Sequence, residues 1–84
     1  MQYFYTARFL RSLKRFDELV QDDVFRAVKL FEKGTNNTIL KLHKLHGKFK
    51  SYHAFSANFS YRIIVKIGKG SAYYVDVGTH DIYL

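Results

Sequence analysis

The stretch that decides the fold is SYRIIVKIGKGSAYYVDV, residues 60–77. Side chains alternate along its first half, which predicts a strand because successive side chains point to opposite faces. One face would carry Tyr61, Ile63, Val65 and Ile67, and the other Arg62, Ile64 and Lys66. The run Gly68-Lys69-Gly70-Ser71 is a hairpin turn signal. A further strand through Tyr73, Val75 and Val77, ended by Gly78, would complete the pair.

One more strand is expected just before this hairpin. From Tyr52 onward the pattern alternates again, and one face would carry His53, Phe55, Ala57 and Phe59. The preceding residues 39–50, ILKLHKLHGKFK, mix apolar and basic positions without clear helical or strand periodicity, and residues 35–38 indicate a polar loop. This region is therefore expected to be a basic connection into the sheet.

The first 34 residues predict a short strand and two helices. Tyr3, Phe4 and Tyr5 are β-prone, and Thr6 and Asp17 are each suited to cap a helix. Apolar residues follow each cap at three- and four-residue steps, first Phe9, Leu10, Leu13 and Phe16, then Val20, Val24, Ala27, Val28 and Phe31. Gly34 would stop the second helix. The predicted order is β-α-α-β-β-β, an α+β domain with a helix hairpin packed on one face of a largely antiparallel sheet.

Length and composition limit the function classes. Residues 1–84 fit one domain, because two independent cores would not fit in this length. There is no cysteine, which excludes disulfides and thiolate metal sites, and the core must rest on aliphatic side chains and on eight Phe and seven Tyr. No apolar run approaches the roughly 20 residues of a membrane span, and the N-terminus has no signal-peptide pattern. A cytoplasmic protein is expected.

The charge is large and unevenly distributed. The formal net charge is +7, yet residues 1–32 carry six Lys/Arg against five acids. Residues 33–75 contain eight Lys/Arg and three histidines but no acid. Such a one-signed stretch attracts polyanions and speeds their encounter. It favours nucleic acid or an acidic protein as the partner, the alternative being an ordinary solvated surface.

Three motifs in this order resemble the RelE/ParE toxin superfamily. They are LHGKFKSY at residues 45–52, SYRIIV at 60–65 and VGTHDIY at 77–83. The resemblance spans the whole chain and is nearest to the YafQ-like members of the RelE branch. It implies the toxin of a type II toxin–antitoxin system, of the kind linked to growth arrest and plasmid stabilization. The RelE branch cleaves mRNA, typically on the ribosome, and its toxins are silenced by an antitoxin.

The resemblance leaves other functions open. The ParE branch instead poisons DNA gyrase without nuclease activity. A third possibility is that the fold persists while the activity has decayed, which would leave a module that only binds an antitoxin. If the chain is a RelE-type toxin, the expected partners are mRNA in the ribosomal A site and an acidic antitoxin tail that is partly disordered when free.

Metal-independent RNA cleavage needs a base for the ribose 2′-OH, an acid for the leaving 5′-oxygen and cations for the phosphorane. Histidine suits the proton transfers and arginine suits the phosphate. His80, just beyond Gly78, is the first candidate for acid or base, and the resemblance implies that Arg62 contacts the scissile phosphate. The resemblance adds His43 as a third catalytic residue. The alternatives are a surface His80, an Arg62 that only covers apolar surface and a solvated His43.

The remaining candidates would bind RNA rather than react with it. Basic side chains before and within the second strand would hold phosphates, and the resemblance implies that a C-terminal aromatic stacks on a base. The alternatives are a solvated basic face and an aromatic that anchors the core. The residues are Lys44, Lys48, Lys50, His53 and Tyr83. His53 falls where some RelE-type toxins carry a catalytic lysine, so the chemistry would depend on histidines. No metal or cofactor is expected, because His43 and His46 lack nearby acids. Asp81 could orient His80. The central hypothesis is a phosphodiester held between His80 and Arg62.

Overall fold

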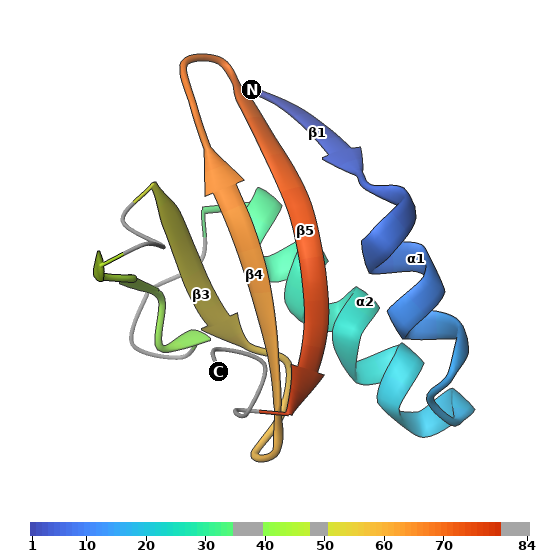
Figure 1. Ribbon diagram of the computed structural model, residues 1–84. Coiled ribbons are helices and arrows are strands. Elements are labelled where there is room, and N and C mark those ends of the chain that lie inside the picture. The colour runs from blue at the N-terminus through green and yellow to red at the C-terminus, as the bar shows by residue number, and fades with distance from the viewer. Residues whose placement is uncertain (35–39, 48–50, 80–84) are drawn as a thin grey trace.

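A computed structural model of the protein describes residues 1–34, 40–47 and 51–79. The chain forms strand β1 (Gln2–Tyr5), helix α1 (Ala7–Lys14), helix α2 (Glu18–Glu32) and strands β2 (His43–Lys44), β3 (Tyr52–Ser56), β4 (Tyr61–Ile67) and β5 (Ser71–Thr79) (Figure 1). Among the described helices, none is long and apolar enough to cross a membrane.

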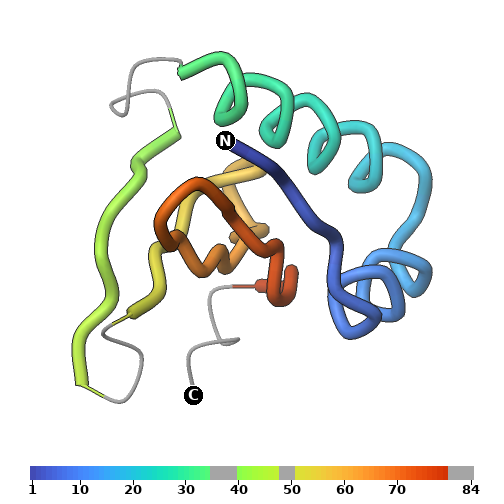
Figure 2. Tube along the Cα trace, turned by 90° about the horizontal axis from the view of Figure 1, so that it is seen from above, coloured from blue at the N-terminus to red at the C-terminus, as the bar shows by residue number. Residues whose placement is uncertain are grey.

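The strands form one mixed sheet in the order β1-β5-β4-β3-β2. β1 pairs with β5 in parallel and every other pair is antiparallel. Viewed from above, α2 runs across one face of this sheet, whereas α1 lies beside the edge formed by β1 and β5 (Figure 2). The predicted α+β class and the largely antiparallel sheet are confirmed.

The basic connection contains a strand that the sequence did not predict. His43 pairs with Ala54 and Lys44 with His53, so β2 forms the outer edge of the sheet. A strand of two residues is too short to show alternation in the sequence, and only its partner β3 makes it one. The observed order is therefore β-α-α-β-β-β-β. The polar loop predicted at residues 35–38 lies outside the described residues.

Both predicted helix caps are confirmed. The Thr6 side chain accepts a hydrogen bond from the backbone N–H of Phe9, and that of Asp17 accepts one from Val20. Gly34 follows α2 with a φ of 74°, the left-handed conformation that glycine adopts without strain. One prediction for α1 is wrong: Leu10 is exposed. Since α1 buries only a narrow stripe against β5, Leu10 falls outside it.

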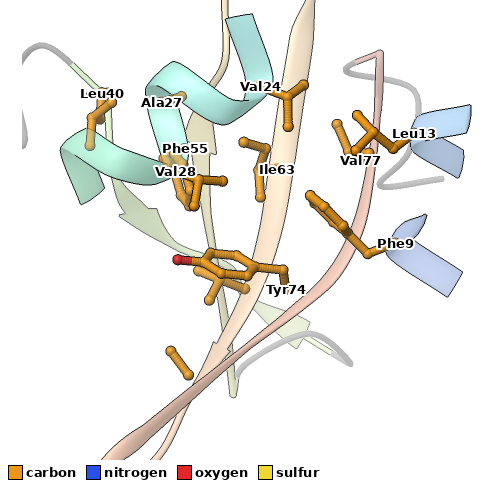
Figure 3. Close-up of a cluster of buried hydrophobic side chains, with 12 residues drawn as sticks. Phe9, Leu13, Val24, Ala27, Val28, Leu40, Phe55, Ile63, Tyr74 and Val77 are labelled. Atoms are coloured by element: carbon orange, nitrogen blue, oxygen red, sulfur yellow. The ribbon is translucent and has the colours of Figure 1, made fainter. Parts of the chain in front are cut away.

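The core lies between α2, α1 and the sheet (Figure 3). Its fully buried side chains come from both helices and from the three central strands, and the largest are Tyr74, Phe9, Phe55, Ile63, Val24, Val28 and Val65. Aromatic contacts link the layers, since Phe31 of α2 stacks on Phe55 of β3 with ring centroids 4.8 Å apart. The predicted reliance on an aromatic core is thus confirmed.

Two strand predictions need correction. Phe59 does not continue the buried face of β3, because the chain turns after Ser56 and leaves Phe59 94% exposed. In β5 the register shifts: Ile64 pairs with Asp76 while Val65 pairs with Tyr74. This β-bulge gives Val75 no partner of its own and turns both Tyr74 and Val77 toward the core. The strand ends at Thr79 rather than at Gly78.

Asp76 ties α1 to β5. Its carboxylate, only 7% exposed, accepts hydrogen bonds from Ser12 Oγ at 2.5 Å, from Arg8 Nε at 2.9 Å and from the backbone N–H of Val77 at 2.9 Å. Ser12 is also buried. A buried carboxylate with three donors is satisfied, so this cluster fixes where the helix lies against the sheet edge.

We expect Asp76→Ala to lower the free energy of unfolding by about 2–3 kcal/mol, because Ser12 would keep a buried hydroxyl without a partner. Asp76→Asn retains an acceptor for Ser12 and loses mainly the attraction to the exposed Arg8, so its loss should be about 1 kcal/mol or less. Urea unfolding of the three proteins measures both values. Equal stabilities for Asp76→Ala and the wild type would contradict the role of this cluster.

Candidate nucleic-acid interface

The sheet has two faces of different character. Phe55, Ile63 and Val65 point into the core beneath α2, so their face is called the inner face. Residues that alternate with them lie on the opposite, outer face, and the register places His43, Ala54, Arg62, Ile64 and Lys66 there. Arg62 was predicted to face away from Ile63 and Val65, and the pairing confirms this.

Arg62 holds the turn between β3 and β4 with one end of its guanidinium. Its Nη1 donates to the backbone carbonyls of Asn58 at 3.0 Å, Phe59 at 3.1 Å and Tyr61 at 3.2 Å. Within the described part of the chain, these bonds all use Nη1. The other N–H groups of the fork stay available for an anion, so Arg62 can bind a phosphate while its position is fixed by the turn.

His43 is exposed and held in one tautomer. Its Nδ1 lies 2.9 Å from the backbone carbonyl of Lys41. Because a carbonyl oxygen only accepts, Nδ1 carries the proton, and the neutral ring then has a free lone pair on Nε2. Lys41 has a φ of 56°, which is uncommon for a residue other than glycine, and this conformation precedes the strand that carries His43. The hydrogen bond to Lys41 thus orients the imidazole.

His43 and Arg62 share the outer face at a moderate separation. The row His43–Ala54–Ile64 runs across three strands, and Arg62 is two residues along β4 from Ile64. Strand spacing and rise put their Cα atoms roughly 12 Å apart. Both side chains project from this face, and the Arg62 guanidinium is held at the β3–β4 turn. The sheet therefore brings these two predicted catalytic residues to one surface.

Lys44 and His53 lie elsewhere. They pair with each other, and His53 also pairs with Val65, so both belong to the inner-face side of the sheet near its edge. They line a hollow with Ser51 and Ile67. The structure thus separates these two predicted RNA-binding residues from Arg62, which is on the other face.

The His53 imidazole is partly buried beside positive charge. Its Nδ1 is inaccessible to solvent and has no hydrogen-bond partner among the described residues. Burial, the Lys44 ammonium and then His43 lower the pKa of His53 below the ordinary value of 6.5. Desolvation disfavours the charged ring, so His53 is neutral at neutral pH.

This shift predicts a pH-dependent stability. Since the pKa is lowered in the folded state, the unfolded chain binds the proton more readily below about pH 6.5, and folding is destabilised as the pH falls through that value. We expect His53→Gln to lose less stability than the wild type between neutral and mildly acidic pH. Urea unfolding across that range measures the difference. Parallel losses in the two proteins would contradict the lowered pKa of His53.

Four of the predicted site residues lie outside the described residues, namely His80, Lys48, Lys50 and Tyr83. Asp81 lies outside them too. The described chain ends at Thr79, whose backbone pairs with Tyr61, and Gly78 pairs with Arg62. The end of β5 therefore lies directly beside Arg62. The roles of the five residues outside the described ranges stay predictions.

A group of cations on α1 was not predicted as part of the site. Arg8, Arg11, Lys14 and Arg15 line a hollow together with Ser12 and Asp76. The sequence showed only that these residues share a helix, whereas the β5 edge beside them comes from the far end of the chain. Among the described residues, no group of three or more histidines and acids is placed to hold a metal ion.

No family model and no curated protein sequence matches the chain. Solved structures do. The crystal structure of YafQ from E. coli strain BL21(DE3) superposes with a TM-score of 0.81 at 17% identity, covering 99% of this chain and 97% of that one. The RelB–RelE antitoxin–toxin complex from Methanococcus jannaschii gives 0.77 at 16% identity over 95% and 94%. The E. coli DinJ–YafQ complex gives 0.76 at 17% identity over 96% and 94%. At these identities the likeness establishes the fold.

Proposed function

Because the chain has the fold of the YafQ and RelE toxins, we propose that it is the toxin of a type II toxin–antitoxin pair and cleaves mRNA on the ribosome. The observation that carries the proposal is the presence of Arg62 and His43 on one face of this sheet, in a segment without acids. A guanidinium and an imidazole can together bind a phosphodiester and move its protons.

The proposed chemistry needs no metal or cofactor. Nε2 of His43 takes the proton from the ribose 2′-OH, and the freed oxygen attacks phosphorus while Arg62 stabilises the added charge. His80 gives a proton to the 5′-oxygen as its bond to phosphorus breaks. The products are a 2′,3′-cyclic phosphate and a 5′-hydroxyl. Lys48 and Lys50 would bind neighbouring phosphates, and Tyr83 would stack on a base.

A protein partner is part of the proposal. Several similar structures are toxin–antitoxin complexes, and the +7 net charge of this chain suits an acidic antitoxin segment that folds on binding. The pair would act in the cytoplasm, where mRNA is translated.

The test is cleavage of mRNA on ribosomes programmed with a defined A-site codon. We expect cleavage in the A site with the Mg²⁺ that the ribosome itself requires as the only divalent cation. Intact mRNA at every toxin concentration would contradict the nuclease proposal, and inhibition of gyrase supercoiling by the same preparation would then assign the ParE-type function. If overexpression caused no growth arrest, binding of an antitoxin would be the only function that remains proposed.

A further inference from the structure

Two hollows along α1 join into one groove. The first is lined by the four α1 cations with Ser12 and Asp76. The second includes Ser12, Arg15 and Asp76 again and continues along Phe16, Tyr61 and the end of β5. Because they share three lining residues, the two hollows adjoin, and together they are here called the α1–β5 groove. It leads from the basic surface of α1 to Gly78 and Thr79.

Three of its cations are not neutralised. Among the described residues the ion pairs are Arg8–Asp76 and Arg26–Asp23, so Arg11, Lys14 and Arg15 have no acidic partner there. All three are exposed. Exposed cations gathered on the last turn of α1 and its C-cap residue Arg15 produce a local positive potential that favours a polyanion.

The groove ends beside Arg62. The rings of Phe16 and Tyr61 pack against each other with centroids 4.8 Å apart. Phe16 follows Arg15 in the chain and Tyr61 precedes Arg62, so this contact joins the neighbours of the two arginines. Gly78 lines the groove and pairs with Arg62, so Arg62 and the end of the groove lie on neighbouring strands. Adjacent strands are about 4.8 Å apart.

We propose that the α1–β5 groove holds a second stretch of the RNA backbone, with Arg11, Lys14 and Arg15 on phosphates next to the one at Arg62. The inference rests on the proposed RNA-directed function. Partly exposed Phe16 and Tyr61 beside these cations are the combination that single-stranded nucleic acid requires, a charged track with aromatic surface for bases. An acidic peptide would use the charges but has no bases to stack on these rings.

The test measures binding of a short single-stranded 2′-O-methyl RNA, which has no 2′-OH to react. The variant Arg11→Gln/Lys14→Gln/Arg15→Gln should bind about 10- to 100-fold more weakly at 0.1 M salt, and the slope of log K against log salt should fall by about 2. Arg8 is left intact because it pairs with Asp76. The conservative variant Arg11→Lys/Arg15→Lys should keep most of the affinity.

A matched control removes the same charge elsewhere. Lys29, Lys33 and Lys69 are exposed and lie outside the groove, so their change to Gln should weaken binding less than about threefold. Equal losses in the two triple variants would overturn the proposal, since net charge alone would explain them. No binding by the wild type would also overturn it. Thermal unfolding checks that each variant is folded.

The outcomes separate this inference from the proposed nuclease function. Cleavage on ribosomes by a wild type whose triple variant binds the oligonucleotide unchanged would refute the groove alone. Groove-dependent binding without any cleavage would refute the nuclease alone. If poly-glutamate binding depended on the three residues while RNA binding did not, the groove would be a protein-binding surface and the RNA proposal would fail.

Discussion

Replacing His80 by alanine is expected to slow mRNA cleavage by about 10²- to 10⁴-fold, the usual contribution of a general acid or base. The variant should also lose growth arrest in cells. Without the imidazole, the 5′-oxygen would leave unprotonated, which is unfavourable. Single-turnover cleavage on programmed ribosomes measures the loss, and the pH–rate profile should lose one limb.

His46→Ala is the matched control. His46 is an exposed histidine of the basic segment, residues 33–75, and has no proposed catalytic role. It should cleave at close to the wild-type rate. A folded His80→Ala protein that still cleaves and still arrests growth would remove His80 from the site and leave His43 as the remaining catalytic histidine.

Arg62→Ala is expected to slow cleavage by about 10²- to 10³-fold, because the variant loses the charge that stabilises the phosphorane. Arg62→Lys should recover part of this loss, since an ammonium keeps the charge but lacks the fork. The cleavage rate and the affinity for the uncleavable oligonucleotide should be measured separately. A loss in rate larger than the loss in affinity identifies stabilisation of the transition state.

Arg62 also holds the β3–β4 turn, so a second variant must separate the two roles. Asn58 Oδ1 accepts hydrogen bonds from the backbone N–H groups of Ser60 and Tyr61, both at 2.9 Å. Asn58→Ala loosens the same turn and leaves the guanidinium in place. It should keep most of the activity. If it were as slow as Arg62→Ala, the contribution of Arg62 would be to the turn and not to the phosphate.

The strands and helices that repeat a pattern over several residues could be predicted from the sequence. Alternation in residues 61–67, the caps Thr6 and Asp17 and the apolar stripe of α2 each reflect local geometry, and each was confirmed. The outward direction of Arg62 followed from the same alternation. Its hydrogen bonds to the turn did not, because they depend on how the chain bends after Ser56.

The sequence by itself determined every element except β2, the excess of positive charge and the residue types able to move protons and bind phosphate. Tertiary structure alone decided which residues lie next to one another. β2 exists because His43 and Lys44 pair with β3, and the bulge at Val75 shows only in the pairing with β4. The α1 cations reach the end of β5 because Asp76 binds Ser12 and Arg8, 64 and 68 residues away. Contacts between residues so distant leave no periodicity in the chain, so no local pattern can predict them.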